Sequence, residues 1–160
     1  MSSWPVGRET IIELLEKGHL ERVVPNSDFA YRLVAEAHAH MKSVEKIIGF
    51  DYSGAYQLGY DAVRKACTAL LAQQGLRPTT TGGHIAVVVA IRAQFNGQYG
   101  SPAFSKVDSL RRGRADSQYP QSTTPSVSKD DATYCRETAQ EIIVAVDKVF
   151  ASDKLESFIR

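Results

Sequence analysis

The sequence predicts an all-α protein, an up-and-down helical bundle of four to five main helices with short extra helices at its ends. Apolar residues recur at intervals of three and four through most of the chain, which is the spacing of one helix face. The connections between these periodic segments are short, as in an antiparallel bundle. A length of 160 residues suits one domain. We therefore expect a single domain over residues 1–160 with its core over about 27–151.

A short helix is expected over residues 8–17 and a long helix over about 28–48, joined by a connector over 19–25. Asn26 or Ser27 can cap the long helix, because their side-chain oxygens accept hydrogen bonds from the first free N–H groups. Its apolar stripe consists of Phe29, Leu33, Ala37, His40, Val44, Ile47 and Ile48.

The third helix shows the clearest periodicity in the chain. Asp51 can cap it and Gly75 can end it. Its stripe consists of Tyr52, Ala55, Tyr56, Gly59, Ala62, Val63, Ala66, Cys67, Leu70 and Leu71. The small side chains in this stripe would let another helix approach closely.

Residues 76–83 are expected to form a loop because of their proline and glycines. The fourth helix is expected over about 84–95. Its run of β-branched residues over 85–91 could also be a buried strand. We prefer the helix, because the sequence offers no second strand with which it could pair.

The remaining elements are predicted as a turn over 96–102, a helix over 105–118, a loop with two prolines over 119–127, a helix ending near residue 151, and a tail helix over 153–159. Ser128 and Asp131 have the spacing of a capping box at the start of the last long helix, although Glu or Gln is more usual at the fourth position.

Composition excludes several classes of protein. Apolar residues make up 43% of the chain and charged residues 23%, which is ordinary for a globular domain. Mean hydropathy is −0.24, and no apolar run approaches the roughly 18 residues of a membrane span. The first ten residues do not have the pattern of a secretory signal. We therefore expect a cytoplasmic protein without a membrane partner.

Neither a metal site nor a cofactor is expected. Cys67 and Cys135 are far apart in the sequence, which argues against a disulfide scaffold or a cysteine zinc site. His38 and His40 lie about 200° apart on a helix and cannot share a ligand. The common nucleotide, zinc-protease and hydrolase motifs are missing from the sequence.

Positive charge is concentrated in the middle of the chain. Residues 76–115 carry a net charge of +5, while the rest of the chain carries −4. This asymmetry suggests an anionic partner, although a solvated basic face explains it equally well. The basic residues of the segment are Arg77, Arg92, Lys106, Arg111, Arg112 and Arg114.

Arg114 stands out on a helical wheel of the fifth helix. At about 100° per residue it falls about 20° from Val107, in the middle of the apolar stripe. An arginine there must be paired or face a cleft, unless the helix has already ended at Gly113 or the side chain snorkels to solvent. Arg111 lies at the edge of the stripe. Arg112 points away and can pair with Asp116, four residues on.

His84 follows Gly82 and Gly83 at the start of a helix. Free backbone N–H groups at such a position favour an anion. A plain helix N-terminus is the simpler interpretation, and the sequence leaves both open.

Three segments together resemble the HEPN superfamily, and most closely its small stand-alone prokaryotic members. They are SGAYQLGYDAVRKACTALLAQQGLRP, the following TTTGGHIAV, and SLRRGRADSQYP. The resemblance extends over roughly residues 30–150. It implies a helical bundle that dimerises, and often a metal-independent RNase that is the toxin of a toxin–antitoxin pair.

The family signature is an arginine, a polar residue, and a histidine four to six positions after the arginine. The resemblance makes Arg114 the signature arginine, whereas Ala115 replaces the polar residue and Tyr119 stands where histidine is expected. Tyrosine titrates near 10 and is a poor general base at neutral pH, unlike histidine. His84 could replace the missing histidine if it faces the same cleft. The expected catalytic residues are therefore Arg114, Tyr119 and His84, and the expected nucleic-acid-binding residues are Arg111, Arg112, Arg77 and Lys106.

Two functions from different classes follow. The first is a HEPN-like homodimer that binds RNA, as a degenerate endoribonuclease with weak or no cleavage. The second is a non-catalytic module that contacts a partner protein such as an antitoxin. A third, weaker interpretation is a small-molecule site at Tyr52, Tyr56 and Tyr60, which fit the core and an interface better.

Overall fold

Helices dominate the computed structural model, which describes residues 4, 6–97 and 101–158. The described part contains six α-helices, one 3₁₀ helix and one pair of short strands. The elements are α1 (Arg8–Glu16), β1 (Leu20–Arg22), α2 (Ser27–Ile47), α3 (Tyr52–Gln74), β2 (Leu76–Pro78), α4 (Gly83–Phe95), η1 (Pro102–Lys106), α5 (Val107–Gln118) and α6 (Lys129–Ala151). The all-α helical bundle predicted from the sequence is confirmed.

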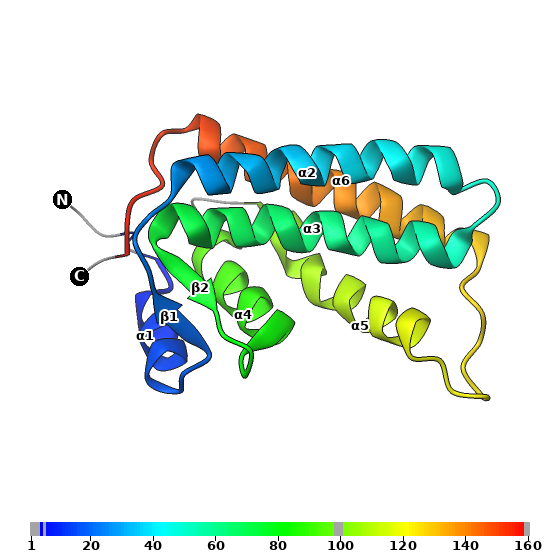
Figure 1. The fold of residues 1–160 in the computed structure, drawn as a ribbon, viewed down its shortest axis with the longest axis horizontal. Coiled ribbons are helices and arrows are strands. Elements are labelled where there is room, and N and C mark those ends of the chain that lie inside the picture. Colours follow the sequence, from blue (N-terminus) through cyan, green and yellow to red (C-terminus); the bar gives the residue numbers. More distant parts are fainter. Residues whose placement is uncertain (1–3, 5, 98–100, 159–160) are drawn as a thin grey trace.

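Helix α3 is the centre of the bundle (Figure 1). It forms an antiparallel hairpin with α2, packs along α6, and also contacts α5 and α4. The small residues of its stripe permit this close packing. A Cβ atom on Gly59 would lie 3.0 Å from Sγ of Cys135 on α6. The side chains of Val63, Cys67 and Leu70 are fully buried.

Local capping chemistry sets the helix ends as expected. Asn26 Oδ1 accepts a hydrogen bond from the Phe29 N–H at 2.9 Å, and Asp51 Oδ1 accepts one from the Gly54 N–H at 2.8 Å. Gly75 ends α3 with φ of 77°, a conformation that glycine adopts without strain. Ser128 and Asp131 form the predicted capping box of α6.

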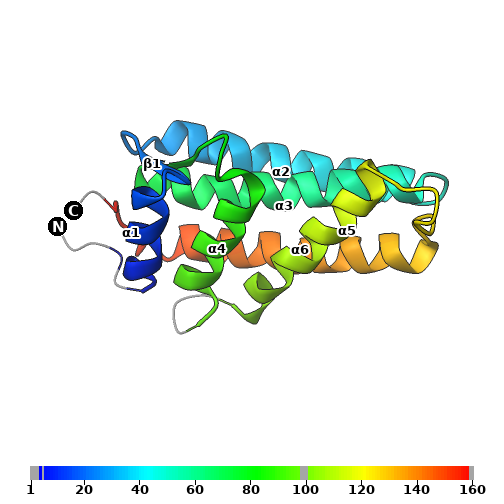
Figure 2. The ribbon, with the colours of Figure 1, turned by 90° about the horizontal axis from the view of Figure 1, so that it is seen from below.

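The segment over 85–91 is helical, so the alternative of a buried strand is wrong. Helix α4 lies across the bundle (Figure 2), and most of its side chains are buried. A helix satisfies its own backbone groups, which a single strand without a partner cannot do. The backbone of α4 can therefore be buried without leaving its polar groups unpaired.

Two sequence predictions are corrected by contacts between distant segments. The connector over 19–25 and the loop over 76–83 contain an antiparallel strand pair, in which Glu21 lies opposite Arg77. The buried side chains of Leu20 and Leu76 anchor this pair.

The predicted tail helix over 153–159 is absent from the described residues, which continue to 158 without helix. Phe158 is instead buried, and its N–H donates to the carbonyl of Gln74 at 2.8 Å. Residue 159 lies outside the described residues, as do residues 98–100 of the predicted turn over 96–102.

The segment that carries Arg114 begins as the 3₁₀ helix η1 and continues as α5. Helix α5 passes through Gly113 and ends at Gln118. Gly113 faces the hydroxyl group of Tyr56 so closely that a Cβ atom would overlap it. The absence of a side chain at residue 113 therefore lets α5 approach α3.

Within the described part of the chain, no helix combines the length and the apolar character that crossing a membrane requires.

Candidate functional site

Arg114 packs on the ring of Tyr60. The guanidinium carbon lies 5.9 Å from the centre of that ring, and the side chain of Arg114 is only 20% exposed. Because α5 continues past Gly113, the alternative in which the helix ends there is wrong. A cation above an aromatic face is held by the negative potential of the ring, which accounts for an arginine in an apolar stripe.

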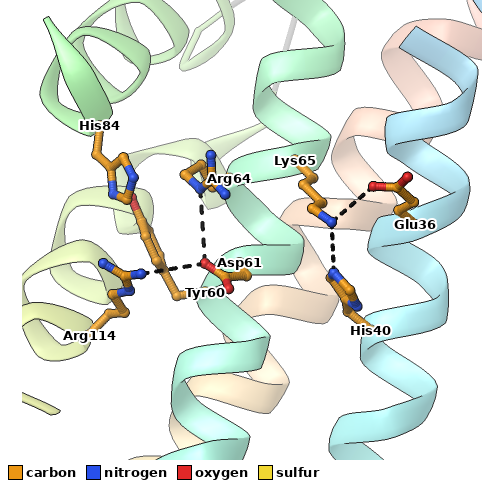
Figure 3. Close-up of polar contacts among 8 residues, drawn as sticks. All are labelled: Glu36, His40, Tyr60, Asp61, Arg64, Lys65, His84 and Arg114. Atoms are coloured by element: carbon orange, nitrogen blue, oxygen red, sulfur yellow. Dashed lines mark hydrogen bonds and ion pairs between the residues drawn. The ribbon is translucent and has the colours of Figure 1, made fainter. Parts of the chain in front are cut away.

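His84 reaches the same tyrosine from the start of α4. Its Nδ1 atom lies 3.3 Å from the Tyr60 hydroxyl, and the two rings are 5.6 Å apart between centres. Figure 3 shows His84 and Arg114 on the same side of α3, next to Tyr60. The structure thus brings together two of the three residues expected to be catalytic.

Two further residues of α3 complete this group, and the sequence did not single them out. Asp61 lies next to Tyr60, and Arg64 is one helical turn further along. Oδ1 of Asp61 is 3.9 Å from Nε of Arg64 and 3.9 Å from Nη2 of Arg114. We call Tyr60, Asp61, Arg64, His84 and Arg114 the arginine cluster.

The charged groups of the arginine cluster are close but do not form hydrogen bonds with one another. Asp61 Oδ1, Arg64 Nε and Arg114 Nε are all buried atoms without a hydrogen-bond partner. A distance of 3.9 Å exceeds that of a hydrogen bond. Buried polar atoms of this kind are rare and commonly mark a place that water or a ligand fills.

The surroundings of the arginine cluster shift two pKa values. Burial and the nearby charges of Arg64 and Arg114 lower the pKa of His84 below its ordinary value of 6.5. Burial raises the pKa of Tyr60 to about 12. His84 is therefore neutral at pH 7 and able to accept a proton, while Tyr60 keeps its own.

One sequence signal could have identified Asp61 and Arg64. They are three residues apart, and Tyr60 and Arg64 are four apart, so all three side chains lie on neighbouring positions of one helix surface. Asp61 is also the last acidic residue before Asp108. On an isolated helix, however, such a pair cannot be distinguished from an ordinary surface ion pair.

The other predicted site residues are spread over the molecule, and the basic ones are paired with carboxylates. Arg77 on β2 pairs with Glu21 at 2.7 Å, and Lys106 pairs with Glu141 of α6 at 3.0 Å. Tyr119 follows the end of α5 and is 69% exposed. Among the contacts of the described residues, none joins Arg77, Lys106 or Tyr119 to the arginine cluster.

Arg111 and Arg112 share one carboxylate. Nη2 of Arg111 lies 2.9 Å from Asp108, and Nε of Arg112 lies 3.3 Å from it. Arg112 therefore pairs with Asp108 instead of Asp116, because an arginine can equally reach the residue four positions before it. The charge of Arg111 contributes to the lowered pKa of His84, whereas the side chain of Arg112 is 68% exposed.

A second polar group lies on the α2 side of α3 and differs from the arginine cluster because hydrogen bonds join its members (Figure 3). Lys65 donates to Glu36 Oε2 at 2.9 Å and to His40 Nε2 at 2.9 Å. Because Lys65 meets both an anion and a neutral acceptor, its charge is used within the fold.

The described residues contain no group of three or more His, Cys, Asp and Glu side chains that could hold a metal ion. The arginine cluster offers guanidinium, imidazole and phenol groups beside the carboxylate of Asp61. Guanidinium groups bind and stabilise anionic oxygens, and the imidazole can transfer protons.

Comparison with known families agrees with this architecture. The family model described as HEPN domain matches residues 30–149, three quarters of the chain. The protein belongs to the HEPN family. No curated protein and no solved structure matched the chain.

The arginine cluster predicts how the titration of His84 responds to substitution. Arg64→Ala or Arg114→Ala removes a positive charge that opposes protonation, so the pKa of His84 should rise toward 6.5 in either variant. The rise should be partial, because burial is the larger cause of the shift. Titration of the imidazole resonances by NMR would measure it.

Arg112→Ala is the matched control, because Arg112 pairs with Asp108 and is not among the charges that shift the pKa of His84. An unchanged or lower pKa in both cluster variants would contradict the described geometry.

Proposed function

We propose that the protein is a homodimeric RNA-binding member of the HEPN family, with weak or no endoribonuclease activity. The observation that supports it is the arginine cluster. Two guanidinium groups and one imidazole gather around a single carboxylate, and both arginine Nε atoms lack a partner. The cluster therefore carries a positive charge with unused donors, which suits a phosphate group.

A phosphodiester would be held by Arg64 and Arg114 together. The planar guanidinium presents two parallel N–H donors to a phosphate. The carboxylate of Asp61 attracts both guanidinium groups and lies 3.9 Å from each, which offsets the repulsion between them. The face of the Tyr60 ring packs against the guanidinium group of Arg114 and holds it in place.

Cleavage, if it occurs, would give a 2′,3′-cyclic phosphate. His84, neutral at pH 7, would take the proton of the 2′-hydroxyl, and the 2′-oxygen would attack phosphorus while the bond to the 5′-oxygen breaks. Arg114 would stabilise the charge of the phosphorane. The departing 5′-oxygen needs a proton, which histidine normally supplies at the signature position and which Tyr119 supplies poorly.

A protein-interaction module, with a partner such as an antitoxin, is the second candidate. It is favoured by the two departures from the signature, Ala115 and Tyr119. The 69% exposure of Tyr119 also fits a side chain that contacts a partner protein, since aromatic residues are common at the centres of interfaces.

Homodimer formation is supported by the outer face of α4. This helix is apolar on nearly all sides, a pattern typical of a helix that is covered all round. Ile85 is nevertheless 58% exposed and Val89 37% exposed. These two residues lie one helical turn apart on α4, after His84. A second copy of the chain packed on this face would bring two arginine clusters near one interface.

The assembly prediction uses this face. Sedimentation at micromolar concentration should give about twice 17.6 kDa, and Ile85→Glu with Val89→Glu should shift the protein to monomer, because charge opposes burial. Val144→Glu, at an exposed valine of α6, is the control and should stay dimeric. A monomeric wild type would contradict the dimer.

RNA binding should depend on salt and on the cluster arginines. Single-stranded RNA of mixed sequence, followed by fluorescence anisotropy, should bind less tightly as salt rises, because phosphate contacts release counterions. Arg114→Ala and Arg64→Ala should each lower affinity about tenfold or more, as expected for lost charge-assisted hydrogen bonds. Arg77→Ala should have little effect, because Arg77 pairs with Glu21.

Salt-independent binding, or no binding at any salt concentration, would argue against an RNA partner. The protein-interaction module would then be the better account of the arginine cluster.

The signature position predicts a gain of activity. Tyr119→His should raise RNA cleavage, most strongly near pH 7, because a positioned acid or base contributes about 10²–10⁴-fold. Adding Arg114→Ala should remove the gain, and EDTA should leave it unchanged. If neither wild type nor Tyr119→His cleaves RNA, the ribonuclease proposal fails.

A further inference from the structure

A cavity of about 350 Å³ lies on another side of α5, away from the arginine cluster. None of the five cluster residues lines it. Its walls come from α3, α5, the first turns of α6 and the segment before α6. The lining residues are Tyr56, Gly113, Asp116, Ser117, Thr124, Pro125, Ser126, Val127, Asp131 and Tyr134.

The electrostatics of this cavity are opposite to those of the arginine cluster. Two carboxylates, Asp116 and Asp131, line it from different helices, and no lysine or arginine is among the lining residues. Burial raises the pKa of Tyr56, and the negative charges of Asp131 and Asp116 raise it further. Both carboxylates therefore act electrostatically on the hydroxyl of the same lining residue, Tyr56.

Helix ends reinforce this negative potential. Asp116 and Ser117 belong to the last turn of α5, the negative end of that helix dipole. The positive end of α6 lies opposite, but Asp131, a lining residue, stands in its first turn and offsets it.

Tyr56 lines the cavity, and its hydroxyl has unused acceptor capacity. Tyr56 is 6% exposed. Its hydroxyl oxygen is the atom closest to the position that a Cβ atom on Gly113, another lining residue, would occupy. This hydroxyl donates to the carbonyl of Leu110 over a long 3.4 Å, and no group of the described chain donates to it. A ligand with N–H groups could donate a hydrogen bond to the hydroxyl oxygen of Tyr56.

The part of the wall formed by the segment before α6 and the start of α6 is held by its own hydrogen bonds. Thr124 accepts from the N–H of Gln121 at 3.0 Å and donates its own N–H to the carbonyl of Gln121 at 2.9 Å. Asp131 Oδ2 accepts from the N–H of Ser128 at 2.9 Å. The cavity is therefore formed before any ligand enters, which lowers the cost of binding.

We propose that this cavity binds a compact organic cation, a guanidinium or primary ammonium group on a short apolar stem. The cationic head would donate hydrogen bonds to Asp116, Asp131 and the Tyr56 hydroxyl, and the stem would pack on the ring of Tyr134. The cavity volume of about 350 Å³ lies at the lower end of the range of volumes found for small-molecule sites. The same head group occurs in free amines and in the arginine or lysine side chains of a peptide.

Calorimetric titration of the full chain with butylguanidinium tests this proposal. Binding is expected, whereas the neutral isostere butylurea should bind at least about tenfold more weakly, because it cannot form charge-assisted hydrogen bonds. Acetyl-Gly-Arg-Gly-amide separates the two sources. Tighter binding of the peptide supports a protein side chain as the ligand, and weaker binding supports a free small cation.

Asp116→Asn should lower the affinity for butylguanidinium about tenfold or more. Asp130→Asn is the matched control, since Asp130 is also exposed and in the same region but does not line the cavity. Tyr56→Phe should weaken binding as well, and the thermal midpoint of each variant checks that it is folded. Equal affinity in wild type and Asp116→Asn, equal binding of butylurea, or no binding at millimolar concentration would overturn the proposal.

Discussion

The arrangement of both candidate sites depends on the burial of α3 among four other helices. Because Gly59 lacks a side chain, α6 can lie against α3, and because Gly113 lacks one, α5 can do the same. The ring of Tyr60 is then fixed between α4 and α5 with 1% exposure. His84 and Arg114 reach this one ring from two helices, so their mutual position follows from the packing of α3.

The polar groups on α3 differ in how completely they are satisfied. Lys65 is hydrogen-bonded to Glu36 and His40, and such a group stabilises the fold because its charge is matched by partners within the chain. Arg64 and Arg114 face Asp61 at distances too long for hydrogen bonds. Leaving buried donors unsatisfied costs stability, and that cost is characteristic of positions that bind something else.

Helix α5 separates two regions of opposite charge. Arg111 and Arg114 lie on the side that faces Tyr60 and His84, whereas Gly113, Asp116 and Ser117 lie on the side that faces the cavity. The basic side is suited to phosphate and the acidic side to a cation. A single short helix can do both because its side chains project in all directions around its axis.

Local chemistry in the sequence determined the helices and their ends, because caps such as Asn26, Asp51 and the Ser128–Asp131 box involve residues three positions apart. It also marked Arg114, since a helical wheel needs only the local period. Only the tertiary structure decided that Glu21 pairs with Arg77 across two strands and that Phe158 is buried beside Gln74. For the same reason, Asp61 and Arg64 became recognisable as site residues only when α5 brought Arg114 to them, because contacts between residues 50 or more positions apart leave no periodic pattern in the chain.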